Sequence, residues 1–206
     1  MLVKVCGMRS PDNIRQVELA GPDIMGFIFH PASPRFVAEL PEYMPLRCLR
    51  AGVFVHSDTD SILRTAETFG LHIVQLHGEG SPELCRFLLG HGLKVIRALG
   101  VSSREDLKAA ADFEGACDYL LLDTACARHG GSGRMFDWDI LESYTGGIPF
   151  FLSGGIGPDS AKRIGEVRHP LLCGVDINSR FETAAAVKDA AAVEKFIKEI
   201  KQISRI

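Results

Sequence analysis

The sequence contains no long hydrophobic run and no excess of charge of either sign. No stretch approaches the roughly 20 apolar residues that span a bilayer, and residues 1–7 lack the apolar run of a signal peptide. A formal net charge of −3 over 206 residues gives no broad positive surface to attract nucleic acid or anionic lipid. These absences predict a cytoplasmic protein without membrane or nucleic-acid partners, in which any anion site is local.

Paired cysteines are also absent. The sequence forms no CxxC motif, and its cysteines do not cluster with the seven histidines, which disfavours a zinc site and a disulfide framework. The six cysteines are Cys6, Cys48, Cys85, Cys117, Cys126 and Cys173. We therefore expect reduced thiols and no metal.

Short apolar runs alternate with longer amphipathic runs along the whole chain, a pattern typical of βα units that close on a parallel sheet. Eight runs are strand candidates: Leu2–Val5, Ile24–Phe29, Leu49–Phe54, Ile73–Leu76, Lys94–Ala98, Tyr119–Leu122, Pro149–Leu152 and Leu172–Asp176. Eight units predict a single α/β domain over residues 1–206, a compact (β/α)8 TIM barrel whose active site lies at the carboxyl ends of the strands. Because the chain is short for this fold, some outer helices must be short or missing. A doubly wound open sheet is the structural alternative.

Local signals support several of the intervening helices. Pro11 and Pro158 each suit the first turn of a helix. Ser102 and Glu105 have the spacing of a capping box, which predicts a helix start there. The last predicted helix, Lys188–Ile200, has apolar residues every three or four positions, which is the pattern of an outer-ring helix.

One segment between predicted strands has no helical pattern. Residues 124–138 contain the polar, glycine-rich stretch Arg128–Arg134. Such a stretch is too flexible for a helix and predicts a long active-site loop.

A glycine-rich turn follows the seventh predicted strand. Gly154 and Gly155 lie just before a predicted helix, so backbone N–H groups can converge on an anion there. Alone, a glycine pair after a strand is more often only a tight turn. In barrels, however, the loops after strands seven and eight often bind phosphate. Since Asn178 and Ser179 follow the eighth strand, we predict a phosphate site formed by these four residues.

A thiol and a lysine share one face of the first strand. Cys6 ends that strand, and strand alternation places it on the same side as Lys4, toward the barrel interior. A buried ammonium there would favour the thiolate, the form that acts as a base. The alternative is that Lys4 pairs with a core carboxylate and Cys6 only packs.

Two aspartates end apolar strands at the same rim. Asp123 follows the sixth predicted strand, where desolvation would raise the pKa of its carboxyl group and suit it to act as an acid. Asp176 ends the eighth strand. The alternative for Asp123 is a cap on a loop or helix. Two carboxyls and a thiol around one rim would allow acid–base chemistry without a metal.

Two further residues are candidates for substrate contact. Arg35 lies on the second loop between prolines and aromatics, where a fixed guanidinium suits a substrate carboxylate. His77 follows the fourth strand and either lines the same rim or only hydrogen-bonds within its own loop. A single histidine does not make a metal site.

Taken in order, short blocks along nearly the whole chain resemble the family of phosphoribosylanthranilate isomerases. The blocks begin with Lys4-Val5-Cys6-Gly7-Met8, continue through Gly26-Phe27-Ile28-Phe29, Ser33-Pro34-Arg35, Gly52-Val53-Phe54-Val55, Val74-Gln75-Leu76-His77-Gly78 and Leu121-Leu122-Asp123-Thr124, and end with Gly130-Gly131-Ser132-Gly133, Phe136-Asp137-Trp138, Leu152-Ser153-Gly154-Gly155-Ile156 and Val175-Asp176. Their order and spacing are far more specific than any single motif.

The resemblance implies a cofactor-free Amadori rearrangement of N-(5′-phosphoribosyl)anthranilate to 1-(2-carboxyphenylamino)-1-deoxyribulose 5-phosphate in tryptophan biosynthesis. By the family's pattern, Asp123 is the general acid and Cys6 the general base. Arg35 would hold the anthranilate carboxylate, with His77 and Asp176 as further substrate contacts. The partner is thus a small phosphoribosyl substrate; nothing in the sequence demands more than a monomer, and a homodimer stays open.

The chain departs from the family's pattern after the eighth strand. Where many members have Ser-Gly and a later glycine before Lys-Asp, this chain has Ser179-Arg180-Phe181-Glu182 and then Ala186-Val187-Lys188-Asp189. This difference leaves open whether Arg180 contacts phosphate or points to solvent.

Other functions of the same barrel fit the sequence less well. A metal-dependent sugar-phosphate epimerase would need several histidines and carboxylates at the rim. A Schiff-base aldolase would need a lysine near a strand's carboxyl end, and only Lys4, one layer deeper, comes close. A phosphosugar-binding module would not need both Cys6 and Asp123.

Overall fold

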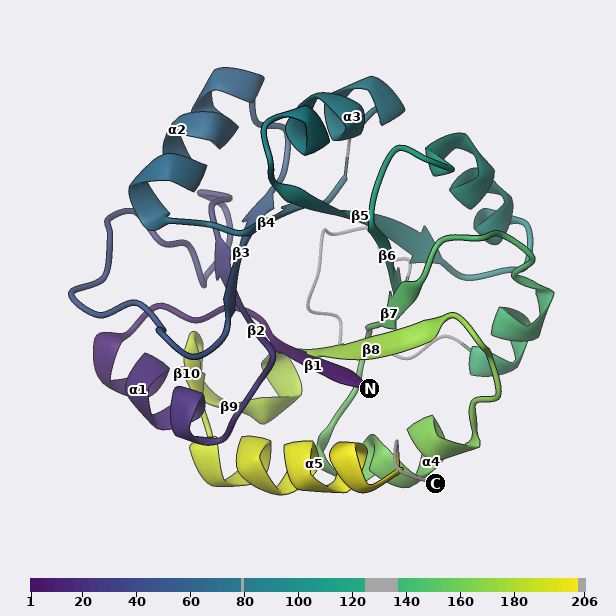
Figure 1. Cartoon of the computed structure of the whole chain (residues 1–206). Coiled ribbons are helices and arrows are strands. Elements are labelled where there is room, and N and C mark those ends of the chain that lie inside the picture. Colours follow the sequence, from purple (N-terminus) through teal and green to yellow (C-terminus); the bar gives the residue numbers. More distant parts are fainter. Residues whose placement is uncertain (79, 125–136, 204–206) are drawn as a thin grey trace.

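The computed structural model describes residues 1–78, 80–124 and 137–203. Eight parallel strands close into a barrel in chain order, surrounded by helices (Figure 1). The strands are β1 (Leu2–Val5), β2 (Ile24–Ile28), β3 (Leu49–Phe54), β4 (Ile73–Leu76), β5 (Lys94–Val101), β6 (Tyr119–Thr124), β7 (Phe150–Leu152) and β8 (Leu172–Ile177). The predicted (β/α)8 barrel is confirmed. The open-sheet alternative is wrong, because β1 pairs directly with β8.

The outer layer is uneven, as predicted from the chain length. Its α-helices are α1 (Pro11–Leu19), α2 (Thr59–Phe69), α3 (Pro82–Gly90), α4 (Ala161–Glu166) and α5 (Ala190–Ile203), and its 3₁₀ segments are η1 (Asp106–Phe113), η2 (Trp138–Ser143), η3 (Pro158–Ser160) and η4 (Ser179–Phe181). Residues 29–48, all of which are described, form no helix between β2 and β3. None of the described helices is long and apolar enough to cross a bilayer.

A carboxylate on α1 holds the segment that lacks a helix. Glu18 accepts hydrogen bonds from the backbone N–H groups of Leu46 and Arg47, at 2.5 and 2.6 Å, and from the Tyr43 hydroxyl. These bonds satisfy backbone donors that a helix would otherwise pair internally. The Glu18 contacts thus tie the long connection to the outer layer.

Two details of the predicted helices are wrong. The capping box of Ser102 and Glu105 does not form, because the Asp106 carboxylate instead accepts from the backbone N–H and hydroxyl groups of Ser102 and Ser103. The following element is therefore the 3₁₀ segment η1. Lys188 is not helical either: the last helix begins at Ala190, although its predicted apolar face is buried.

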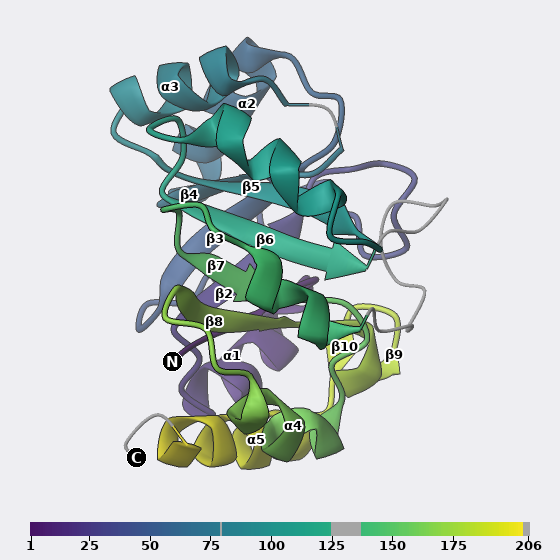
Figure 2. The same ribbon diagram turned by 90° about the vertical axis from the view of Figure 1, so that its right-hand side faces the viewer.

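Lys188 belongs to a small hairpin that the sequence did not predict. Strands β9 (Glu182–Ala184) and β10 (Val187–Lys188) pair antiparallel and bring Lys188 opposite Glu182. The hairpin lies at the end of the barrel toward which the strand arrows point (Figure 2). It therefore lines the rim that carries Cys6 and Asp123.

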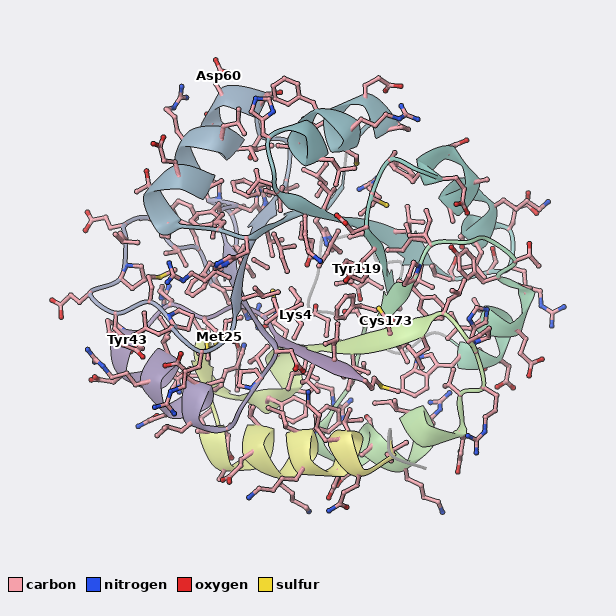
Figure 3. The ribbon with its side chains drawn as sticks, viewed as in Figure 1. Lys4, Met25, Tyr43, Asp60, Tyr119 and Cys173 are labelled. Carbon is pink, nitrogen blue, oxygen red and sulfur yellow. The ribbon has the colours of Figure 1, made fainter. Side chains whose placement is uncertain are left out.

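The apolar core has two layers. One fills the inside of the barrel and consists of Ile24, Ala51, Ile73, Ile96, Ala98, Leu121 and Phe151. The larger one lies between the strands and the outer helices. Figure 3 shows Lys4 and Tyr119 inside the ring of strands and Asp60 outside it, on α2. The described cysteines are all free thiols, and Cys126 lies outside the described residues.

Candidate active site

A buried ion pair inside the barrel joins the first strand, β1, to the last barrel strand, β8. Lys4 Nζ donates to Asp176 Oδ1 at 2.7 Å, and the Lys4 side chain has no exposed surface. The other carboxylate oxygen accepts from Ser153 Oγ at 3.5 Å. Burial opposes the charge on Lys4, but the Asp176 carboxylate and Cys6 outweigh it and raise the pKa of the lysine. The ion pair therefore favours the charged ammonium inside the barrel.

Cys6 immediately follows β1, two residues after Lys4, and lies next to this ion pair. Its backbone N–H donates to the Ile177 carbonyl at 2.9 Å, and the residue is only 4 % exposed. Gly26 on β2 makes room for the thiol, since a Cβ added there would lie 2.8 Å from Cys6 Sγ. The glycine thus sets how closely the thiol approaches the neighbouring strand.

The charge state of Cys6 reflects two opposing effects. Burial raises the pKa of the Cys6 thiol above its ordinary value, whereas the ammonium groups of Lys4 and Lys188 lower it. Lys4 acts in the predicted direction, but desolvation dominates and the net pKa is raised. The alternative of a Lys4 pair with a core carboxylate is also realised, in the Lys4–Asp176 bond. Cys6 is therefore a thiol at rest that nearby cations help to ionise.

Asp123 lies near the end of β6, which runs two residues further than predicted. Burial, reinforced by the Asp176 carboxylate, raises the pKa of Asp123 to about 6. Its Oδ1 atom accepts from the backbone N–H of Thr124 at 2.8 Å. The predicted raised pKa is confirmed, and the carboxyl group can hold a proton close to neutral pH.

The Lys4–Asp176 ion pair affects the pKa of both Cys6 and Asp123. Asp176 raises the pKa of both Cys6 and Asp123, and Lys4 lowers both. The geometry agrees, since Ser153 at the end of β7 contacts Asp176, and a Cβ on the next residue, Gly154, would lie 2.9 Å from Asp123 Oδ1. The structure thus brings together the thiol, the carboxyl and the Lys4–Asp176 pair that the sequence placed on three strands.

The glycine-rich turn after β7 contacts the acid. Gly154 and Gly155 have φ angles of 85° and 67°, in the left-handed region that glycine tolerates. A Cβ on Gly154 would lie 2.9 Å from Asp123 Oδ1. Pro158 then opens η3, as predicted. The turn therefore needs glycine at both positions and lies beside the predicted acid.

The loop after β8 supplies the other predicted phosphate contacts. Ser179 begins η4, and Arg180 Nε lies 2.7 Å from the position of a Cβ on Gly157. Arg180 is thus an exposed residue whose guanidinium lies beside Gly157. Asn178 is partly engaged, because its Oδ1 accepts from Lys188 Nζ at 2.7 Å. The phosphate roles of these residues stay predictions.

Arg35 has a partner that the sequence did not indicate. Its Nε and Nη2 atoms donate to the two oxygens of Glu182 at 2.8 and 2.7 Å. Glu182 also accepts from Lys188 Nζ at 2.5 Å. Sequence reasoning missed Glu182 and Lys188 as site residues. The available signal was their place in the divergent segment after the eighth strand, where charged residues stood in an otherwise small-residue stretch.

His77 is partly buried at the end of β4, and its backbone N–H donates to the Phe54 carbonyl at 2.9 Å. Arg97 donates to the carbonyls on either side of it, those of Leu76 and Gly78, at 3.1 and 2.6 Å. Arg97 therefore fixes the backbone that carries His77. A substrate contact by His77 stays a prediction, and the predicted loop Arg128–Arg134 lies outside the described residues.

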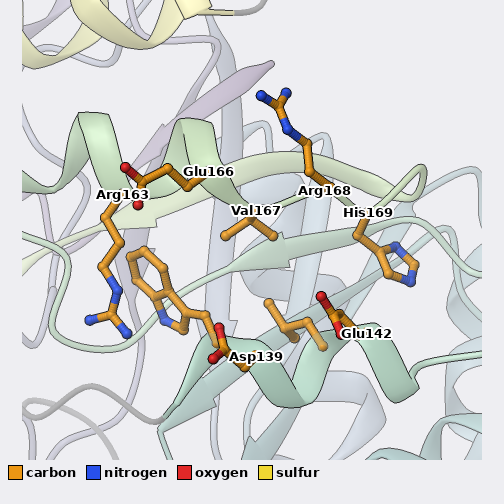
Figure 4. Close-up of a pocket in the computed structure, with 9 residues that line it drawn as sticks. Asp139, Glu142, Arg163, Glu166, Val167, Arg168 and His169 are labelled. Atoms are coloured by element: carbon orange, nitrogen blue, oxygen red, sulfur yellow. The ribbon is translucent and has the colours of Figure 1, made fainter.

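A groove elsewhere on the molecule is separate from this site. It lies on the outer surface between η2 and α4, where Arg163 covers the Trp138 ring at 4.5 Å (Figure 4). Acidic, basic and apolar side chains alternate along it, including Glu142, Glu166 and His169. Nothing in this groove is shared with the Cys6 and Asp123 rim.

Comparisons with known proteins agree with this geometry. The family described as N-(5'phosphoribosyl)anthranilate (PRA) isomerase matches residues 3–199. The N-(5'-phosphoribosyl)anthranilate isomerase of Phocaeicola vulgatus is 52% identical over 202 residues, which cover 98% of each chain. The crystal structure of phosphoribosyl anthranilate isomerase from Thermotoga maritima is 32% identical, with a TM-score of 0.82, over 98% of this chain and 99% of that one.

A further solved structure contains a ligand. It is a phosphoribosyl anthranilate isomerase in complex with reduced 1-(o-carboxyphenylamino)-1-deoxyribulose 5-phosphate, 31% identical to this chain, with a TM-score of 0.79 and coverage of 98% and 100%. In each comparison, sequence and fold thus agree over nearly the full length of this chain and of the related protein. The resemblance in the signature blocks is confirmed, and the chain belongs to the family of N-(5'-phosphoribosyl)anthranilate isomerases.

Proposed function

We propose that this chain converts N-(5′-phosphoribosyl)anthranilate to 1-(2-carboxyphenylamino)-1-deoxyribulose 5-phosphate, with Asp123 as general acid and Cys6 as general base. One observation carries the assignment: a buried thiol and a carboxyl with a raised pKa share the Lys4–Asp176 pair beside a glycine-rich turn. The product-like ligand in the related complex supports the substrate class. A cytoplasmic location and a monomeric state stay predictions.

In the first step, the proton on Asp123 goes to the ring oxygen of the ribose. The C1′–O bond breaks as the anthranilate nitrogen forms a double bond to C1′, which gives an open-chain iminium. An acid with a pKa of about 6 is suited to this step, because it is protonated in a useful fraction near neutral pH and transfers its proton readily. Burial of Asp123 supplies that property.

In the second step, the Cys6 thiolate removes the proton from C2′, whose acidity the iminium raises. The C2′–H electron pair moves into the C2′–C1′ bond and neutralises the nitrogen, which leaves an enolamine. Loss of the proton from the 2′ hydroxyl and return of a proton to C1′ then give the ketone. Lys4 and Lys188 favour the thiolate and so oppose the effect of burial.

Two anchors would hold the substrate around these groups. The backbone N–H groups at Gly154 and Gly155, with Asn178, Ser179 and the adjacent β8 loop, would bind the phosphate, as helix-start turns do. Arg35 would bind the anthranilate carboxylate at the opposite side. Fixing both ends of a flexible sugar places C2′ and the ring oxygen between base and acid, which contributes much of the rate.

Conversion of phosphoribosylanthranilate, followed by loss of its fluorescence, tests the proposal. Cys6→Ser and Asp123→Asn should each lower kcat by about 10²- to 10⁴-fold and leave KM within about tenfold, since general acid–base groups act mainly in the transition state. Cys85→Ser, which changes a buried thiol on α3, is the matched control and should keep full activity. Normal kcat with a raised KM in either site variant would contradict the assigned roles.

The same assay separates this reaction from other barrel chemistries. Turnover should persist in the presence of a metal chelator and after treatment with borohydride in the presence of substrate. Inhibition by the chelator would indicate a metal-dependent epimerase, and inactivation by borohydride would indicate a lysine Schiff base.

A further inference from the structure

Two cations share one carboxylate immediately beside the base. Glu182 accepts both side-on donors of Arg35, Nε and Nη2, and also the ammonium of Lys188. The three side chains are 7 %, 15 % and 0 % exposed, for Glu182, Arg35 and Lys188 respectively. A Cβ on Gly7 would lie 2.7 Å from Arg35 Cδ and 3.3 Å from Lys188 Nζ. The cluster therefore packs on the residue that follows Cys6.

The pairing with Glu182 leaves one edge of the Arg35 guanidinium available. A guanidinium has five N–H donors, and two parallel donors can bind a carboxylate either side-on, through Nε and one Nη, or end-on, through both Nη atoms. Glu182 uses the side-on pair. The Nη1 donors and one Nη2 donor remain for a second carboxylate, and the side chain as a whole keeps 15 % of its surface exposed.

The carboxylate of Glu182 is itself held from several sides. Lys188 Nζ donates to it, and the backbone N–H of Ala186 donates to Oε1 at 3.2 Å. Lys188 is fixed to α1, because Asn13 exchanges two hydrogen bonds of 2.8 Å with its backbone. The hairpin thus holds Glu182 rigidly against the barrel.

We propose that Glu182 is a positioning residue that fixes the guanidinium plane of Arg35 so that its end-on edge receives the anthranilate carboxylate. This inference rests on the proposed function. It also accounts for the charge at the rim: Arg35 and Lys188 carry two positive charges, Glu182 carries one negative charge, and the remaining single charge matches one substrate carboxylate. Glu182 thereby contributes to specificity for a monoanionic aromatic group without touching the substrate.

The Glu182→Gln variant distinguishes positioning from simple competition for Arg35. If Glu182 orients Arg35, KM should rise about 10- to 100-fold with kcat within about threefold, the range expected for loss of a charge-assisted hydrogen-bonded pair. If Glu182 only competed with the substrate, its removal would expose two cations and lower KM. A lowered or unchanged KM would therefore overturn the inference.

Two further variants keep the test decisive. Arg35→Ala should raise KM, and adding Glu182→Gln to it should produce no further rise, because Glu182 acts through Arg35. Additive effects of the two substitutions would contradict this. Glu182→Asp keeps the carboxylate and should recover part of the lost affinity; if its KM equals that of Glu182→Gln, the positioning role fails.

A surface control and the wild type separate this inference from the proposed function. Glu194→Gln breaks an exposed pair with Lys198 on α5 and should leave KM and kcat unchanged. Failure of the wild-type protein to convert phosphoribosylanthranilate would overturn the proposed function. Normal wild-type turnover with an unaltered KM in Glu182→Gln would overturn only the role of Glu182.

Discussion

At the scale of single residues, the chemistry of the site depends on burial, which acts in the same direction on two groups that ionise to anions. Burial raises the pKa of both Asp123 and Cys6, so it keeps a proton on the acid and discourages its loss from the base. The Lys4 ammonium partly reverses both effects. The active combination, a protonated carboxyl with a thiolate, is therefore a minor form that binding and nearby cations must favour.

Two limbs are expected in the pH dependence of kcat/KM for the wild type. Activity should fall below about pH 6, where both groups are protonated, and again above the raised pKa of Cys6, where both have lost their protons. In Asp123→Asn the limb near pH 6 should be replaced by a rise that continues up to the raised pKa of Cys6, because residual activity then follows the thiolate alone. A wild-type profile that is flat between pH 5 and 7 would contradict the titration of Asp123.

Asp123 should also cost the protein stability. Its pKa is 3.8 in an unfolded chain and about 6 in the fold, so ionisation above pH 6 favours the unfolded state by up to roughly 3 kcal/mol. Asp123→Asn should therefore raise the free energy of unfolding at pH 7, by about 1–3 kcal/mol, and the gain should shrink toward pH 4. Urea titrations at the two pH values measure this. A less stable variant at pH 7 would contradict the desolvation account.

At the scale of elements, the features particular to this chain lie in the segments that connect its strands and helices. The β9–β10 hairpin brings Glu182 and Lys188 together at the rim, and the Glu18 contacts replace a helix between β2 and β3. The Glu18 contacts span 28 and 29 positions, and the local hairpin is held by Asn13, which lies 175 positions before Lys188. The short outer helices therefore do not weaken the site, because polar side chains hold the connecting segments.

Removal of the Glu18 carboxylate tests that role. Glu18→Ala leaves the N–H groups of Leu46 and Arg47 without their acceptor and should lower the free energy of unfolding by about 1–3 kcal/mol. Turnover at 25 °C should be unaffected, since Leu46 and Arg47 lie just before the amino end of β3, whereas the candidate site lies at the carboxyl ends of the strands. Glu67→Ala, at an exposed position of α2, is the control, and an equal loss in both variants would argue against a specific role.

At the scale of the whole molecule, the barrel closes where the first and last strands meet. Lys4 and Asp176 are direct neighbours in the β1–β8 register, so their ion pair bridges this closing seam. Closure depends on pairing residues at opposite ends of the chain, which is entropically costly and needs well-packed contacts. The same pair that closes the fold also sets the electrostatics of the site.

Breaking this pair should affect stability and reactivity together. Lys4→Met leaves Asp176 as a buried unpaired charge and should lower the free energy of unfolding by about 3–5 kcal/mol. Lys4→Met/Asp176→Asn should recover much of that loss. In the single variant the pKa of Cys6 should rise further, as measured by the pH dependence of its alkylation. An unaltered alkylation profile would leave Lys4 a structural role only.

The sequence alone was sufficient for the barrel, for most strand positions and for the placement of Cys6 and Asp123 at strand ends on one rim. Those features depend on local patterns: apolar runs at regular spacing, and polar residues at strand ends, which parallel strands bring to one rim. The raised pKa of Asp123 was also predictable, because an apolar strand implies burial.

Only the tertiary structure decided which charges meet. The partners of Lys4 and Arg35 lie 172 and 147 positions away in the chain, and no local pattern encodes such a pairing. The net pKa of Cys6 likewise depends on how desolvation balances the ammonium of Lys4, on the same strand, and that of Lys188, on the distant β10. Hydrophobic periodicity is a property of neighbouring residues, whereas electrostatics depends on distances in space, which exist only once the chain has closed.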